Sequence, residues 1–519
     1  MCYSVIAGTI PSQVVRLKRL LQAVNYLRKD MNFIRILAVR IPKITLRKKK
    51  YQSGRKLIRR TNINKGRRVM TKDKDLTEGR PFNLIFSFAA SMMLGNVFQQ
   101  LYTVVDSIII GKKIGPMGLA AIGGTDWLIF LVNGFLIGLI QGFSVLLGNK
   151  YGEKNEEAFK HYYKKARLIC IVIAIAFVII LTAGSGVLLS VIGTKTEVFD
   201  NAKTYVDIIF MGIPFLVFYQ FFAATLRSRG NSRIPLAAMT VSSLCNIVFD
   251  YVFICVIRLG IAGAALGTVM SECVVMIICG YHLHKNHTVT FGEQKEAEKE
   301  EVFEEGGTYK KLLTVGLPMA LQSVITAVGG LIVISNVNRY DIDFLTGYTI
   351  AGKIYALLEI AASSYGMAVV AYVSQNYGAK KFTRIRQGVR VSLLLGVATA
   401  LVCSFIMIFF GEKSMHLFVD AENISQRVFE YGKEYLLILG LFYPLLYVLY
   451  IVRASLQGIG NTLIPMISSM GQLVMRVSCA IVLTKVIGCS GIYYGEIGAW
   501  MMADIILIAT YIHEIRRSN

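Results

Sequence analysis

Residues 233–256, RIPLAAMTVSSLCNIVFDYVFICV, form an apolar segment long enough to cross a bilayer as an α-helix. The segment nevertheless contains Asn246 and Asp250, which are four positions apart and therefore share one face of a helix. A carboxylate inside a membrane span is energetically costly, so such a residue indicates a functional site by default.

Eleven further apolar segments have similar length, and the whole chain is 54% hydrophobic with a mean hydropathy of +0.55. Only helices and closed barrels satisfy the backbone in lipid, and these runs are too long for barrel strands. The sequence therefore predicts an all-α polytopic membrane protein with twelve transmembrane helices. Their expected spans are 82–110, 119–148, 163–184, 204–226, 233–256, 261–284, 311–335, 345–371, 386–410, 433–455, 462–485 and 490–513.

The net charge of +24 is concentrated at the N-terminus. Residues 1–69 carry 19 Lys and Arg and a single acid, whereas the rest of the chain carries 37 basic and 31 acidic residues. We therefore expect no nucleic-acid partner. Loops after the even-numbered spans hold more Lys and Arg than the opposite loops, which predicts that both termini are cytoplasmic.

The basic segment 1–69 has two interpretations. Apolar residues between positions 15 and 37 alternate with Lys and Arg, as in an amphipathic helix on an anionic membrane surface. The codons of residues 65–69, KGRRV, can instead form a purine-rich ribosome-binding site before Met70. We favour the second interpretation and hypothesise that translation begins at Met70.

The rest of the chain is an internal repeat. LRSRGNSRIP at 226–235 matches LQGIGNTLIP at 456–465, and NKYGEK at 149–154 matches QNYGAK at 375–380. GIAGAALG at 260–267 likewise parallels GCSGIYYG at 488–495. These blocks predict an N-lobe of six helices at 70–284, a polar linker at 285–310 and a C-lobe of six helices at 311–519. An even number of spans makes the repeats parallel, around a central cavity that suits alternating access.

Several observations exclude other functions. The nine cysteines contain no CxxC pair, so neither a disulfide framework nor a zinc site is expected. His282, His284 and His287 are explained by a hydrated helix end. There is no GxxxxGK[ST] loop for a transport ATPase, and we expect neither enzymatic activity nor a cofactor.

Polar residues within the spans are the candidate site. Two chemistries fit the first-half group, namely protonation of neighbouring carboxylates and binding of sodium by oxygen ligands. Solvation of Asp106 near the outer interface, and a structural hydrogen bond for Asp250, are the alternatives. Structural pairing is the expected role of the second-half group. The first group is Gln99, Asp106, Asn246, Asp250 and Thr268, and the second is Lys353, Glu359, Arg476, Glu496 and Asp504.

Other residues within the spans indicate helix packing. The GxxxGxxxG row of Gly134, Gly138 and Gly142 predicts a close helix contact. Prolines at 214, 318 and 444 are candidates for kinks.

Over residues 75–515 the sequence resembles the multidrug and toxic compound extrusion (MATE) family, closest to its bacterial DinF-like branch. The stretches that carry the resemblance are FQQLYTVVDSIIIGKKIGPMGLAAIG (98–123), LLGNKYGEKN (146–155), RSRGNSRIP (227–235), NIVFDYVFICVIRLGIAGAALGTVMSE (246–272) and VSQNYGAKK (373–381).

The resemblance implies export of organic cations and drugs by antiport with protons or sodium. The family's N-lobe cation site falls on Asp106, Asn246, Asp250 and Thr268, and polar cavity residues fall on Gln99 and Tyr205. A seventh-helix Glu used by another branch is replaced by Thr326, so we expect coupling in the N-lobe.

The sequence therefore predicts a multidrug exporter in the inner membrane of a bacterium, with amphipathic or cationic small molecules as substrates. The alternative within the wider superfamily is a flippase of lipid-linked precursors or a polysaccharide exporter. A channel or a membrane scaffold belongs to a different class, and a scaffold poorly explains the N-lobe carboxylates. Substrate identity, coupling ion, stoichiometry and oligomeric state stay open.

Overall fold

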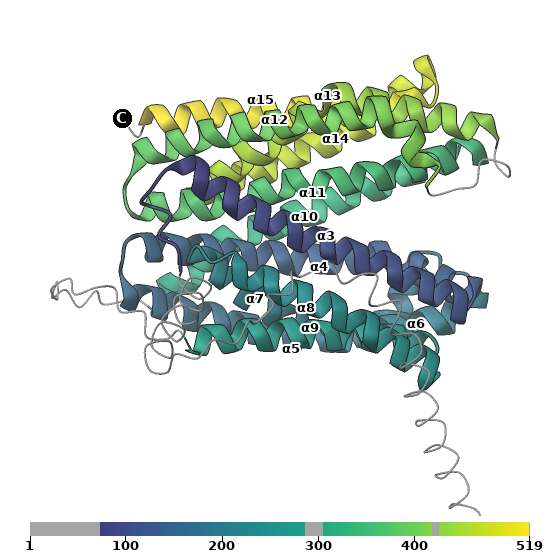
Figure 1. Ribbon diagram of the computed structural model, residues 1–519, viewed down its shortest axis with the longest axis horizontal. Helices are drawn as coiled ribbons and strands as arrows, with labels where there is room; N and C mark the ends of the chain where they lie inside the picture. Colours follow the sequence, from purple (N-terminus) through teal and green to yellow (C-terminus); the bar gives the residue numbers. More distant parts are fainter. Residues whose placement is uncertain (1–72, 286–304, 418–424, 518–519) are drawn as a thin grey trace, which may run out of the picture. The chain divides into compact units, whose positions relative to one another are not determined.

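A computed structural model describes residues 73–285, 305–417 and 425–517 (Figure 1). The predictions for residues 1–69, for most of the linker and for His287 lie outside these residues. The described helices are α3 (Pro81–Lys113), α4 (Pro116–Gly152), α5 (Glu156–Val191), α6 (Thr196–Met211), α7 (Ile213–Ser228), α8 (Arg233–Asp250), the π-helix η1 (Tyr251–Val256), α9 (Ile261–Lys285), α10 (Glu305–Val337), α11 (Ile342–Gly378), α12 (Phe382–Met415), α13 (Gln426–Gly458), α14 (Leu463–Ile487) and α15 (Ser490–Arg517). Helices α3–α9 form the N-lobe, and α10–α15 form the C-lobe.

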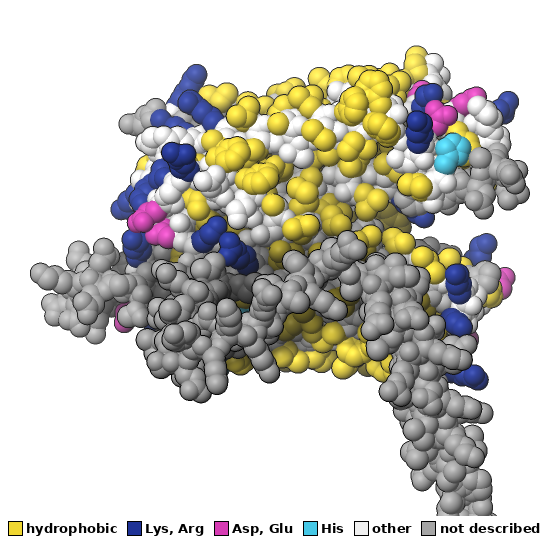
Figure 2. All heavy atoms as spheres, viewed as in Figure 1, with side chains coloured by type: hydrophobic (Ala, Val, Ile, Leu, Met, Phe, Trp, Pro, Cys, Tyr) yellow, Lys and Arg dark blue, Asp and Glu magenta, His cyan; other side chains and the backbone are white. Residues whose placement is uncertain are grey.

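The twelve predicted spans are confirmed. Eleven helices are long and apolar enough to cross a membrane, and α6 with α7 forms a twelfth, bent span. Hydrophobic side chains cover the middle of the visible helices, whereas Lys and Arg gather near their ends (Figure 2). This distribution fits helices whose middles face lipid and whose ends face water.

The fourth predicted span, 204–226, is two helices rather than one. α6 and α7 meet at 45° around Gly212, and Pro214 stands in the first turn of α7. Proline is favoured at the start of a helix because its missing N–H has no partner there. The kink expected at Pro214 is observed as this bend, whereas Pro318 and Pro444 lie inside the continuous helices α10 and α13.

The matched blocks of the repeat adopt matched turns. Gly230 and Gly460 both have positive φ, at 76° and 90°, where a side chain would be strained. The next residue in each block caps the following helix, because Asn231 Oδ1 accepts from the Ile234 N–H and Asn461 Oδ1 from the Ile464 N–H. The repeat found in the sequence is therefore also a repeat of the structure.

The two lobes pack through glycines. A Cβ atom at Gly142 of α4 would lie 2.4 Å from the Cα of Gly316 on α10. Further along the same row, a Cβ atom at Gly138 would lie 2.5 Å from the carbonyl oxygen of Met319. The predicted close contact of the GxxxGxxxG row is thus made with the C-lobe, where small residues let backbones approach.

Repeat-related glycines also join the lobes at the ends of α4 and α11. A Cβ at Gly152 would lie 1.9 Å from the carbonyl oxygen of Gln375, and one at Gly378 would lie 1.9 Å from that of Asn149. The contact is reciprocal, as expected where equivalent helices cross on a pseudo-twofold axis.

Next to this crossing lies a polar interlobe latch, formed by Leu76, Thr77, Ser228, Gln375, Asn376, Lys381 and Arg384. The buried Gln375 side chain donates to the Ser228 carbonyl and accepts from the Leu76 N–H, both at 2.8 Å. Asn376 donates to the Leu76 carbonyl at 3.1 Å and accepts from Arg384 Nε at 3.1 Å. The latch therefore ties the segment before α3 to the C-lobe.

Two further contacts hold the same segment. Lys381 Nζ donates to the carbonyl of Thr77 at 3.0 Å. Asp73 forms a buried salt bridge of 2.7 Å with Arg229, and Asn231 donates to the same carboxylate at 3.3 Å. Because Arg229 and Asn231 belong to a repeat turn, that turn anchors the segment to the N-lobe while the latch anchors it to the C-lobe.

Candidate functional site

The candidate site centres on the last turn of α8. Asn246 and Asp250 are both fully buried on one face of that helix. The two side-chain oxygens of Asp250 and both polar atoms of Asn246 have no hydrogen-bond partner among the described residues. Leaving a buried polar group without a partner costs about 1–3 kcal/mol, so four such atoms together fit a site built to bind something.

The helix changes its winding directly after Asp250. Residues Tyr251–Val256 form a π-helix, in which Ile257 N donates to the carbonyl of Val252 at 2.8 Å. Such π-helical turns are rare and occur frequently at functional sites. The wider turn sets the position of Asp250 at the point where α8 gives way to η1.

Helix α9 comes close to the same carboxylate through a glycine. A Cβ at Gly267 would lie 2.0 Å from Oδ1 of Asp250, so the carboxylate can occupy this position only against a residue without a side chain. The neighbouring Thr268 is half-buried, and its hydroxyl donates to the Ala264 carbonyl at 3.3 Å. The structure thus brings α9 to Asp250 through Gly267, while the Thr268 hydroxyl is engaged within its own helix.

Asp106 on α3 faces the same place. It is half-buried, one of its oxygens has no partner among the described residues, and its charge interacts directly with that of Asp250. Asp126 on α4 also lies within electrostatic range of Asp106. None of the interactions found for Asp106 and Asp250 in the described chain involves Lys or Arg. Neighbouring carboxylates in a low-dielectric setting need a proton or a cation to balance their charge.

Two tyrosines border these carboxylates. Tyr205 on α6 is buried and lies within electrostatic range of Asp106, Asp126 and Asp250. Tyr102 on α3 interacts with Gln99, which is itself exposed. Of the residues expected from the sequence, Asp106, Asn246, Asp250 and Tyr205 are therefore brought together, and Gln99 lies at their edge.

The sequence reasoning missed two acids of the N-lobe that interact with tyrosines of the site. Asp126 lies in the predicted span 119–148 and Glu272 in the predicted span 261–284, where Glu272 interacts with Tyr102 and Tyr219. Both satisfy the criterion that selected Asp250, an acid inside an apolar run. We name Asp106, Asp126, Asn246 and Asp250 the N-lobe carboxylate cluster.

The polar residues of the C-lobe are mostly paired. Arg476 bonds to Glu496, which also accepts from Trp500 Nε1 at 3.1 Å. Glu359 accepts from the Tyr450 hydroxyl at 2.8 Å, whereas Lys353 is exposed and forms no salt bridge found in the described chain. The expected pairing of Arg476 is therefore confirmed, but Glu359 is held by a tyrosine and not by Lys353.

Asp504 is the exception in the C-lobe. Neither of its oxygens has a hydrogen-bond partner among the described residues, although Arg453 lies within electrostatic range. This carboxylate has a cation nearby, which distinguishes it from Asp250.

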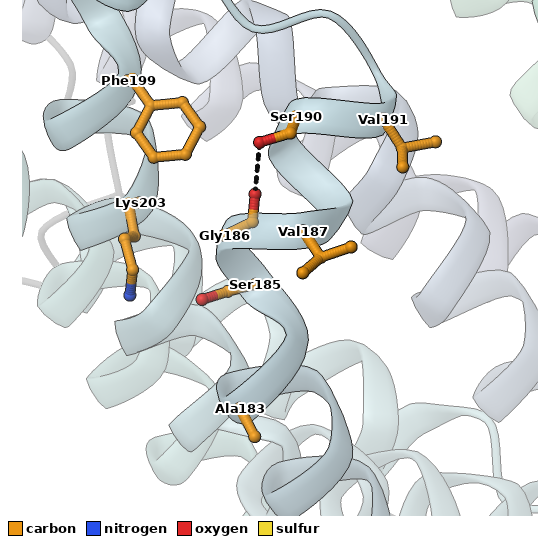
Figure 3. Close-up of a pocket in the computed structure, with 8 residues that line it drawn as sticks. All are labelled: Ala183, Ser185, Gly186, Val187, Ser190, Val191, Phe199 and Lys203. Carbon is orange, nitrogen blue, oxygen red and sulfur yellow. Dashed lines mark hydrogen bonds between the residues drawn. The ribbon is translucent and has the colours of Figure 1, made fainter.

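A separate pocket lies between α5 and α6. Phe199 and Lys203 of α6 face the last turns of α5, where the Ser190 hydroxyl donates to the Gly186 carbonyl at 2.9 Å (Figure 3). Lys203 pairs with Asp207 at 2.6 Å. None of the eight lining residues is acidic, so this pocket is not part of the carboxylate cluster.

The MatE family model matches residues 91–252 and 318–482, more than half of the chain and one copy in each lobe. The probable multidrug resistance protein YoeA of Bacillus subtilis is 26% identical, over 74% of this chain and 82% of its own length. A FAD transporter of Shewanella oneidensis is 22% identical, over 72% of this chain and 81% of its own length.

Solved structures show the same fold. A MOP superfamily transporter from Pyrococcus furiosus superposes with a TM-score of 0.78 at 22% identity, covering 86% of this chain and 99% of that one. One match to the family model lies in each lobe, and each match includes the repeat turn of that lobe, at Gly230 or Gly460. The chain therefore belongs to the MatE family of multidrug efflux transporters.

Proposed function

We propose that the protein is a secondary active exporter of amphipathic, often cationic small molecules, driven by inward movement of a proton or sodium ion. The observation that carries this proposal is the buried pair Asn246 and Asp250, whose polar atoms have no partners among the described residues. A proton would neutralise Asp250, whereas sodium would take oxygen ligands from Asp250, Asn246 and Asp106. Both ions fit this oxygen-rich donor set, because sodium, like calcium, favours oxygen ligands.

The carboxylate cluster can couple the ion to substrate by competition. An organic cation near Asp106 or Asp126 would lower the affinity of the cluster for the coupling ion. The bound ion would likewise lower the affinity of the cluster for the organic cation. Such reciprocity between two ligands is a requirement of linkage. Tyr205 adds an aromatic face against which an organic cation can pack.

Alternating access would use the interlobe latch. In the conformation seen here, hydrogen bonds between the lobes gather at the end that carries Gln375 and Arg384. Export would require this end to open while the other end closes, so the latch bonds would break once in each cycle. The family's repeats rocking about a fixed central site would accomplish this exchange.

Ethidium efflux from energised vesicles tests the proposal, with the proton and sodium gradients collapsed separately. We expect export by wild type to require one gradient, and Asp250→Asn to abolish export while still reaching the membrane. Glu78→Gln, which removes an exposed carboxylate outside the spans, is the control and should export normally. Normal export by Asp250→Asn would show that this carboxylate is structural.

We further propose that the latch end faces the cytoplasm of a bacterial cell, because the loops at this end are the basic ones. Membrane-impermeant maleimide should label Lys195→Cys from outside intact cells and leave Glu157→Cys unlabelled. Both positions are exposed and lie at opposite ends of α5, Glu157 in its first turn and Lys195 in the connection to α6. The reverse labelling pattern would invert the proposed orientation.

A further inference from the structure

A second pocket lies between α5 of the N-lobe and α10 of the C-lobe. Four basic residues of α5 line it, and Tyr309 of α10 closes its far side. The basic residues are His161, Lys164, Lys165 and Arg167. This pocket lies outside the carboxylate cluster, and the proposed transport mechanism does not use it.

Direct contacts join the two helices at this pocket. His161 Nε2 lies 3.2 Å from the Thr308 hydroxyl, and Lys165 Nζ lies 5.0 Å from the centre of the Tyr309 ring. Lys164 and Arg167 are exposed on the same wall. The pocket therefore spans the lobe interface and presents exposed positive charge.

The level of this pocket within the bilayer follows from the sequence of α5. The basic residues end at Arg167, and the apolar run of the span begins at Leu168. Lys and Arg at such a boundary lie at the level of the lipid head groups. The charged part of the pocket thus faces phosphates, while its apolar part, Leu168 and Ile171, faces acyl chains.

Two rows of exposed apolar side chains continue from the pocket into the span. On α5 they are spaced by three or four residues, so they follow one face, and on α10 they are spaced by four. The α5 row is Leu168, Val172, Ile175 and Ile179, and the α10 row is Leu313, Leu317 and Leu321. Each row starts at the pocket, because Leu168 lines it and Leu313 lies one helical turn after the lining residue Tyr309, so acyl chains along the rows would begin beside the basic residues.

We propose that this pocket binds an anionic phospholipid, with its phosphate held by Lys164 and Arg167 and its acyl chains lying along the two rows. Basic pockets between transmembrane helices are a known form of lipid recognition. A soluble phosphate would use the charges but would leave the two apolar rows without a role. Because the pocket joins the lobes, a bound lipid would contact both moving halves of the transporter.

Native mass spectrometry of the full chain, purified in detergent and titrated with phosphatidylglycerol or phosphatidylcholine, tests this assignment. We expect wild type to retain phosphatidylglycerol preferentially and Lys164→Gln/Arg167→Gln to lose that preference, by roughly tenfold or more in apparent affinity. The matched control is Lys160→Gln/Lys310→Gln, which removes the same charge from residues of α5 and α10 that do not line the pocket and should retain the lipid. The charge-conserving pair Lys164→Arg/Arg167→Lys should also retain it.

Equal retention by the pocket variant and its matched control would overturn the proposal. So would equal retention of the two lipids by wild type. Complete displacement of phosphatidylglycerol by millimolar inorganic phosphate would also overturn it, because a site for a soluble anion needs no acyl chains. Both substituted side chains are exposed, and a thermal melt identical to wild type would establish that the pocket variant is folded.

Discussion

Removing the Gln375 side chain should weaken the closed latch without touching the carboxylate cluster. In the structure this buried carboxamide makes two bonds that join the lobes, to Ser228 and Leu76. Gln375→Ala leaves the Leu76 N–H and the Ser228 carbonyl buried without partners. At about 1–3 kcal/mol for each group, the closed conformation loses about 2–6 kcal/mol relative to one in which water reaches them.

Even the lower bound changes the conformational population measurably. A loss of about 2 kcal/mol shifts a two-state equilibrium roughly 30-fold, because each 1.4 kcal/mol is a factor of ten. A conformation populated at about 1% would then rise to roughly a quarter of the molecules. Export should slow, because the transporter would spend more of each cycle in the conformation that is open at the latch end.

Spin labels at Glu157→Cys and Thr383→Cys report on this equilibrium by pulsed electron resonance. Both positions are exposed at the latch end and belong to opposite lobes. With the native cysteines removed, Gln375→Ala should add a population at longer distance. Gln457→Ala is the matched control, because its bond of 3.0 Å to Gln322 lies within the C-lobe. Identical distance distributions for wild type and Gln375→Ala would refute the reasoning.

Three further substitutions test other parts of the structure. Gly267→Ala should impair coupled efflux while expression is retained, because its Cβ would lie 2.0 Å from Oδ1 of Asp250; efflux at the wild-type rate would show that the close approach is unimportant. Gly142→Leu should lower the melting temperature by several degrees, because it forces α4 away from α10, and an unchanged melt would contradict that packing. Burial raises the pKa of Asp73 above its ordinary value of 3.8, although the Arg229 charge opposes this. The folded state therefore binds the proton more tightly, and the resulting stabilisation is complete below pH 3.8 and disappears as the pH rises through the raised pKa. Asp73→Asn does not titrate, so the melting temperature of wild type minus that of the variant should increase on acidification. A decrease in this difference would show that folding lowers the pKa of Asp73.

The spans and the repeat could be predicted because both depend on local sequence. Apolar length determines what can cross a membrane, and the Gly-Asn-x-x-Ile-Pro blocks specify a positive φ at glycine and an asparagine cap. The bend between α6 and α7 could be predicted in part from the sequence, because Pro214 lies at that position. The π-helical turn after Asp250 carried no comparable signal, because none of residues 251–256 is a glycine or proline.

The site was predictable only as far as its residues were unusual for their surroundings. Asn246 and Asp250 were conspicuous in an apolar run, and Asp126 was equally conspicuous but overlooked. The role of Gly267 depends on a neighbour on another helix, which no spacing within α9 indicates. Gln375 likewise bonds to the Leu76 backbone, 299 residues away, so its function follows from tertiary structure alone.

The two lobes share a fold but differ in how they treat buried acids. In the C-lobe, Arg476 compensates the charge of Glu496, and the Tyr450 hydroxyl donates a hydrogen bond to Glu359. In the N-lobe, no such donor was found for Asp250 in the described chain, and this carboxylate is fully buried. An external cation adds little stabilisation to a carboxylate that already has a partner within the protein. It adds much more to a buried carboxylate whose charge has no partner. The proposed ion coupling therefore belongs to the N-lobe, because Asp504, the C-lobe acid without a hydrogen-bond partner among the described residues, has the Arg453 charge within electrostatic range. If this division holds, Glu496→Gln should lower stability, since it leaves the Arg476 charge buried, while the ion dependence of efflux by the folded fraction stays unchanged. A changed ion dependence in that variant would place part of the coupling in the C-lobe.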